Sequence, residues 1–234
     1  MRQKLDLPSA LDGQLWYYRN QGRTHARHHH SELELNLIAR GTGVYLLGKR
    51  KFEIRRGDLL WLFPAQEHVL IEESPDFEMW IAVFKPRAVR RVAVDADARV
   101  LRRANPPGEY CRRLPRQSHA RLESLFAEIV GAQDRPGFFN AGLAYALLCS
   151  WHNFQQSHDV PVHDVHPAVE KAARLIRDNT NRLTLSELAR QAGLSPSRLS
   201  RLFKQQTGVA LVDFRNRQRI ETFLELYGAG QRMK

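Results

Sequence analysis

The segment 183–208, with the sequence LTLSELARQAGLSPSRLSRLFKQQTG, constrains the fold of this chain more than any other stretch. Thr184 and Glu187 stand three residues apart, which is the spacing of a capping box at the start of a helix. Gly193 then interrupts the helical periodicity where a tight turn is needed. Ser195 followed by proline is a typical start for the next helix, because proline at the first helical position gives up only an unpaired amide. The pattern predicts two short helices joined by a turn, a helix-turn-helix.

The second of these helices has an apolar face and an outward face without acidic side chains. Leu199, Leu202 and Phe203 share the inner face. Side chains that can donate to phosphates and to base edges remain on the outer face; they are Ser197, Arg198, Ser200, Arg201, Lys204 and Gln205. A solvated helix pair in a bundle is the alternative interpretation of the periodicity alone. The caps, the turn glycine and the basic outer face together favour double-stranded DNA as the partner.

Charge is distributed unevenly along the chain. Residues 166–234 carry 13 Lys/Arg against 6 Asp/Glu, whereas the other 165 residues carry 23 against 19. A basic C-terminal part suits a polyanionic partner. No apolar run reaches the roughly 20 residues of a membrane span, and the start of the sequence lacks an apolar secretory core. Cys111 and Cys149 show no metal-type spacing, so a reduced, cytoplasmic protein without a membrane partner is expected.

The periodicity changes along the chain and predicts several parts. Residues 13–84 contain short segments rich in β-formers, separated by glycine, proline or charged turns, which favours a sandwich or barrel. Residues 86–117 are interpreted as an irregular connector, residues 118–157 as helices, and DVPVHDVHP as a linker. The apolar stretch FFNAGLAYALLCSWHNF is expected to be buried against another helix or another subunit. The predicted fold class is α+β multidomain, with a β-barrel or jelly roll in 1–95, a connector and helical segment in 96–160, and an all-α helix-turn-helix domain in 161–234.

The β-rich part contains a set of candidate metal ligands. His28, His30 and Glu34 are an even number of residues apart, so they share one face of an extended chain unless a bulge near Ser31 breaks the alternation. With His68 they supply three imidazoles and a carboxylate, a competent set for Zn, Ni, Fe or Mn. The alternative is that these side chains only form hydrogen bonds in a barrel or lie on its surface. Leucines at positions 33, 35 and 37 occupy the opposite face and need cover, for which the helices in 118–157 are candidates.

The spacing His-x-His-x3-Glu-x6-Gly, which ends at Gly41, resembles the first block of the cupin motif. Gly57, Pro64 and His68 match the second block, with Gln66 where a glycine is common. The resemblance implies a small β-barrel with its ligand site inside.

The two ends of the chain together resemble the AraC family of bacterial transcription regulators. The strongest match is LTLSELARQAGLSPSRLSRLFKQQTGVALVDFRNRQRIE, with the motif Ser195-Pro-x-x-Leu199-x-Arg201-x-Phe203-Lys204 and the later Gly208 and Arg219. The resemblance implies a cupin-type sensor, a helical dimerisation segment and a DNA-binding domain. It therefore implies a homodimeric, sequence-specific regulator that responds to a small-molecule effector or a metal and is not an enzyme. Arg219 would contact the DNA backbone or serve a structural role.

The sequence departs from the family pattern at its C-terminal end. Family members carry two helix-turn-helix units joined by a long helix; residues 212–227 match the joining helix, and no second unit follows in the sequence. Two alternatives therefore stay open. One is a metal-dependent cupin enzyme, such as a dioxygenase or isomerase, and the other is a dimerisation fragment with weakened DNA binding.

Overall fold

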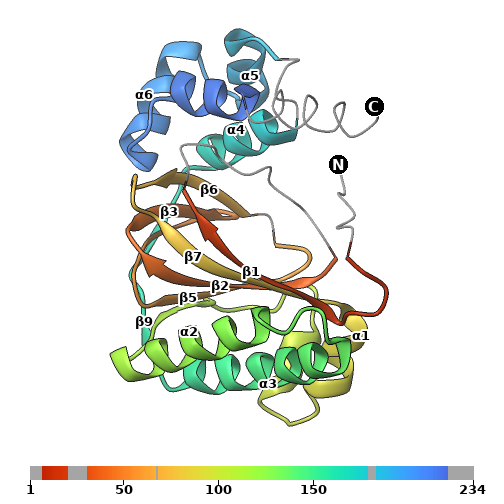
Figure 1. Ribbon diagram of the computed structural model, residues 1–234. Helices are drawn as coiled ribbons and strands as arrows, with labels where there is room; N and C mark the ends of the chain where they lie inside the picture. Colours follow the sequence, from red (N-terminus) through yellow and green to blue (C-terminus); the bar gives the residue numbers. More distant parts are fainter. Residues whose placement is uncertain (1–6, 21–30, 67, 179–182, 221–234) are drawn as a thin grey trace, which may run out of the picture.

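The computed structural model describes residues 7–20, 31–66, 68–178 and 183–220. Figure 1 shows these residues as four stacked layers: a group of small helices, two β-sheets, and a pair of longer helices. The two sheets form the centre of the stack, and each has helices on its outer face. Within the described part of the chain, no helix has the length and apolar character needed to cross a membrane.

The larger sheet contains six antiparallel strands in the order β1-β7-β2-β5-β8-β9. The bounds of these strands are β1 Gly13–Arg19, β2 Leu33–Arg40, β5 Asp58–Leu62, β7 Glu78–Phe84, β8 Cys111–Arg113 and β9 His158–Asp159. The smaller sheet has the order β10-β4-β3-β6. Its strands are β3 Thr42–Leu47, β4 Arg50–Arg55, β6 His68–Glu73 and β10 Val162–Asp164.

Buried side chains from both sheets meet in the interior of this sandwich. Tyr18, Ile38, Tyr45, Phe52 and Leu70 belong to one cluster between the sheets. Gly41 and Gly57 adopt positive φ angles at strand connections, where a side chain would be strained. Two packed antiparallel sheets followed by helices confirm the predicted α+β class, and the arrangement is that of a jelly roll.

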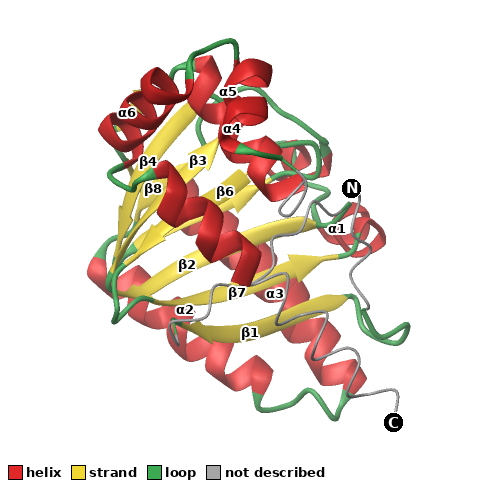
Figure 2. Ribbon diagram, turned by 90° about the horizontal axis from the view of Figure 1, so that it is seen from above, coloured by secondary structure: helices red, strands yellow, loops and turns green. Residues whose placement is uncertain are grey.

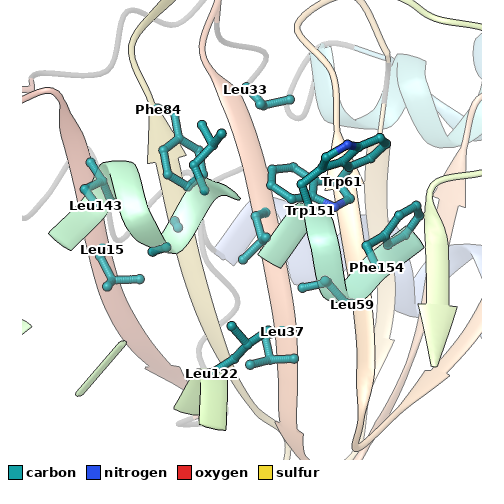
Figure 3. Close-up of a cluster of buried hydrophobic side chains, with 14 of the residues drawn as sticks. Leu15, Leu33, Leu37, Leu59, Trp61, Phe84, Leu122, Leu143, Trp151 and Phe154 are labelled. Carbon is teal, nitrogen blue, oxygen red and sulfur yellow. The ribbon is translucent and has the colours of Figure 1, made fainter. Parts of the chain in front are cut away.

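The outer face of the larger sheet is covered by two helices, α2 Arg116–Val130 and α3 Pro136–Gln155. Leu33, Leu35 and Leu37 alternate along β2 and pack in the same buried cluster as Leu122 and Leu143 of these helices. Figure 3 shows Leu33, Leu37 and Leu122 in this layer, with Trp61 and Trp151 packed nearby. The expectation that the predicted helices cover the leucine face is therefore confirmed.

The prediction of an irregular connector at 86–117 was wrong. This segment contains α1 Pro86–Val92, a 3₁₀ helix at Ala98–Arg102, and strand β8. Pro86 lies at the start of α1, where its fixed φ favours a helix, and Ala88 and Val89 are buried. The prediction of a plain linker at 159–167 was also wrong, because Val162 pairs with Phe52 and extends the smaller sheet.

The C-terminal part is all helical, with α4 Pro167–Asp178, α5 Leu185–Ala192 and α6 Pro196–Thr207. Residues 211–220 form a further helix, and the remainder of the predicted helix 212–227 lies outside the described residues. The predicted capping box is confirmed, since Glu187 N donates to Thr184 Oγ1 and Thr184 N donates to the Glu187 carboxylate. Gly193 has a φ of 76° in the turn, and Ser195 accepts from the amide of Arg198.

Candidate nucleic-acid interface and sensor site

Helix α6 is held by its apolar face and exposes its polar face. Leu199 and Phe203 are 0% exposed, and the Phe203 ring lies 5.5 Å from that of Phe214 on the following helix. The opposite face is open to solvent. Of the side chains predicted there, Ser197, Arg198, Arg201, Lys204 and Gln205 are exposed, and Ser200 is half-buried.

Two further arginines are exposed on the helices that flank α6 in the sequence. Arg219, which was predicted to contact the DNA backbone or to serve a structural role, is exposed on the helix that follows α6. Arg190 is also exposed, in the last turn of α5, next to the turn that leads to α6. The sequence reasoning did not single out Arg190, although its position on the polar side of the short α5 would have identified it.

The acids that the structure describes form no ion pair with the basic side chains on the exposed face of α6. Among the described residues, no ion pair involves a side chain of α6. Glu187 of α5 is committed to its capping box, and the hydrogen bond from the Thr184 backbone amide holds the pKa of this carboxyl below its usual 4.5. An exposed cationic face without paired acids can bind phosphates and the acceptor groups of base edges.

The four predicted metal ligands are only partly described. His28 and His30 lie outside the described residues. Glu34 is 8% exposed and points between the sheets, since Leu33 and Leu35 on either side of it pack on the helices. It pairs with Leu62 at the end of β5, and His68 begins β6 after the intervening loop, so both lie at one end of the sandwich. Within the described part, no three His, Cys, Asp or Glu residues form a group that could hold a metal.

A pocket of about 530 Å³ opens at the same end of the sandwich. Leu47 and Phe52 form part of its wall from the smaller sheet, Gln66 from the loop before His68, and Tyr110 from the opposite side. Its volume lies in the range of small-molecule sites, about 300–1,000 Å³. His68 Nδ1 lies 3.1 Å from the carbonyl oxygen of Gln66, which fixes the ring beside the pocket.

A buried polar pair lies deeper between the sheets. The Asn36 amide nitrogen donates to the Tyr45 hydroxyl at 3.0 Å, and Asn36 is fully buried. Among the described residues, nothing donates a hydrogen bond to Asn36 Oδ1. The sequence reasoning missed this pair; the signal was the position of Asn36, two residues from Glu34 and thus on the same inward face of β2.

Two protein families match the two parts of this structure. Residues 10–151 match the AraC-like ligand binding domain, and residues 176–216 match the bacterial regulatory helix-turn-helix proteins of the AraC family. The first match covers strands β1–β8, α2 and most of α3, and the second covers α5, α6 and the start of the following helix.

Individual relatives agree with this assignment. The chain is 29% identical over 201 residues to the arabinose operon regulatory protein of Escherichia coli, covering 80% of this chain and 64% of that protein. It is 31% identical over 200 residues to the protein of the same name from Salmonella typhimurium, covering 80% of this chain and 66% of that protein. The chain thus spans about two thirds of the length of these curated relatives. Among solved structures, that of the AraC-like transcriptional activator CuxR is similar at 15% identity and a TM-score of 0.42, over 93% of this chain and 79% of the other. Because both of its parts match AraC-family proteins, the chain belongs to the AraC family.

Proposed function

We propose that this chain is a sequence-specific DNA-binding transcription regulator whose helix α6 enters the major groove. The observation that carries the proposal is the exposed, acid-free basic face of α6, supported from behind by the fully buried Leu199 and Phe203. Arg198, Arg201 and Lys204 contact bases or phosphates, with Ser197, Ser200 and Gln205 beside them. Arg219, on the next helix, contacts the backbone. Because regulators act on chromosomal DNA, the site of action is the bacterial cytoplasm.

The interior of the sandwich is the proposed site of a small-molecule effector. Two features support this assignment: the pocket of about 530 Å³, and Asn36 Oδ1, which accepts no hydrogen bond from the described residues. A buried acceptor without a donor is unfavourable, so a ligand that donates a hydrogen bond there would be favoured. A divalent transition metal held by His28, His30, Glu34 and His68 is the alternative ligand at this end of the sandwich.

The exposed face of α3 is the proposed contact surface of a homodimer. Phe138 and Tyr145 are 45% and 50% exposed, and they are seven residues apart, so they lie on the same side of the helix. Large apolar side chains exposed in a row are typical of interfaces between subunits. Pairing of two chains would place two copies of α6 on one duplex, which increases the number of base pairs read.

Selection from a random duplex library tests the proposal without knowledge of the operator. The chain is expected to enrich a common sequence, and the double variant Arg201→Ala/Lys204→Ala is expected to bind the enriched duplex at least about tenfold more weakly. The matched control is Arg90→Ala/Arg103→Ala, which removes the same charge from exposed positions in α1 and just after the 3₁₀ helix. An absence of enrichment, or equal losses in both double variants, would refute the assignment of α6 as the recognition helix.

A further inference from the structure

The two faces of strand β6 contact different parts of the molecule. Val69 and Ile71 are buried in the cluster that forms the core of the helix-turn-helix part, whereas Leu70 between them is buried in the interior of the sandwich. The neighbouring strand β3 alternates in the same way, with Leu46 in the first cluster and Tyr45 in the second. In Figure 1, α4 lies directly over β3 and β6, and Figure 2 shows the small helices over this side of the stack.

A β-bulge changes the register of β6 where it meets the helices. Tyr45 pairs with Leu70, but the preceding Val44 pairs with Glu72, so Ile71 is an extra residue in β6. Two successive residues of a bulge face the same side of a sheet. Both Ile71 and Glu72 therefore face the helix-turn-helix part, and a Cβ built on Gly208, just after α6, would lie 3.3 Å from Glu72 Oε2.

Two arginines bind the backbone of β6 from the helical side. Arg177 Nη1 of α4 donates to the carbonyl oxygen of His68 at 3.1 Å. Arg217 Nη1, on the helix after α6, donates to the carbonyl oxygen of Ile71 at 3.3 Å. Hydrogen bonds from charged donors are stronger than neutral ones. Because the two arginines precede and follow α5 and α6 in the chain, they fix the recognition helix to β6 from both ends.

We propose that β6 is the element through which occupancy of the sandwich interior changes the position of the helix-turn-helix part. The proposal rests on the proposed function, since it names how the effector site regulates DNA binding. A ligand that displaces Leu70 or His68 moves the same backbone whose carbonyl groups bind Arg177 and Arg217. The docked arrangement then loses these bonds and the packing of Ile71, and the population shifts toward a released arrangement. The polar face of α6 is already exposed when the helix-turn-helix part is docked on β6. Release therefore changes the orientation of α6 and leaves its accessibility to DNA the same.

Pulsed electron paramagnetic resonance on the full chain measures docking without DNA or effector. Spin labels are attached at Glu53→Cys on the sandwich and Gln191→Cys on α5, both exposed positions. Cys149 is replaced by alanine, and Cys111 is retained because it is buried. The parent is expected to give one narrow distance distribution. Ile71→Asp, which places a charge under the helices, is expected to broaden it and shows that release is detectable.

The decisive variant is Leu70→Ala, which changes only the inward face of β6. In this variant, the fraction of molecules whose label-to-label distance falls outside the parent range is expected to rise at least about tenfold. The matched control is Leu60→Ala, which removes a buried leucine of the same interior cluster but from the larger sheet, and it is expected to keep the parent distribution. Leu70→Met, which preserves volume, should also keep it, and circular dichroism confirms that each variant is folded.

An unchanged distribution in Leu70→Ala, with a broadened one in Ile71→Asp, would overturn the proposal. Equal broadening by Leu70→Ala and Leu60→Ala would overturn it as well, because the effect would then be general loosening rather than coupling through β6. Neither result depends on DNA binding, so failure of this proposal is separate from failure of the proposed function.

Discussion

The side-chain amide of Asn36 donates a hydrogen bond of 3.0 Å to the hydroxyl of Tyr45, across the space between the two sheets. The pair joins β2 of the larger sheet to β3 of the smaller one. Asn36 Oδ1 accepts no hydrogen bond from the described residues, although the residue is fully buried. A buried acceptor without a partner costs about 1–3 kcal/mol. We therefore assign Asn36 to the proposed effector site rather than to the stability of the sandwich.

Asn36→Leu separates these two roles. The substitution removes the unsatisfied oxygen and fills the interior with apolar atoms, so the free energy of unfolding in urea is expected to stay equal to that of the parent or to rise. Leu35→Ala is the control, since Leu35 is fully buried in the helix-covered layer and its truncation should cost about 2–5 kcal/mol. A loss in Asn36→Leu as large as that of the control would show that Asn36 is a structural residue.

The capping box of α5 gives a prediction on stability and pH. Thr184→Ala removes the N-cap acceptor and is expected to cost about 1 kcal/mol. The Glu187 carboxyl has a lowered pKa in the folded chain, so its contribution is present above its ordinary value of 4.5 and is lost as the pH falls through the lower folded value. The unfolding temperature of the parent should therefore exceed that of Glu187→Gln at about pH 6, and the difference should shrink as the pH is lowered to about 3. An advantage that grows on acidification would contradict the assignment.

The exposed side of α3 predicts the behaviour of the chain in solution. Tyr145→Arg is expected to weaken self-association at least about tenfold, because it places a charge in the proposed apolar contact. Sedimentation equilibrium provides the measurement. Val94→Arg is the control, since Val94 is an equally exposed apolar residue just after α1. If both variants associate as the parent does, α3 is not the subunit contact.

Metal content tests the alternative ligand of the sandwich. If a divalent transition metal occupies the cupin-type site, Glu34→Gln and His68→Ala should each lower the amount of bound metal measured by mass spectrometry, because each removes one ligand. His119→Gln is the control, since this buried imidazole lies within 3.2 Å of Glu123 on α2, away from the inner face of β2. Equal metal content in the parent and in all three variants would rule out a metal bound by these side chains.

Much of this fold could be predicted because the relevant signals are local. The Thr184–Glu187 spacing, Gly193 and the alternating leucines of β2 each depend on neighbouring residues, and the structure confirms them. Helix α1 was missed because seven residues are too few for a clear helical period. Strand β10 was missed because its partner, β4, is more than a hundred residues earlier in the chain.

The candidate sites were predictable to different degrees. The exposure of Arg201 and Lys204 follows from helical periodicity, which the sequence displays directly. The unsatisfied oxygen of Asn36 does not, since alternation along β2 indicates which face Asn36 occupies but not which donors lie opposite it. The docking of Arg217 on Ile71 depends on a bulge and on the packing of two distant segments, neither of which has a local signal.

The salt dependence of DNA affinity tests the central claim most directly. Each phosphate contact neutralised by Lys or Arg contributes about −0.9 to the slope of log K against log salt concentration. On an enriched duplex, Arg201→Ala/Lys204→Ala is predicted to flatten this slope by about 1–2 and to lower affinity, whereas Arg90→Ala/Arg103→Ala keeps the parent slope. The same slope and affinity in the α6 double variant as in the parent would contradict the conclusion that this face of α6 contacts DNA.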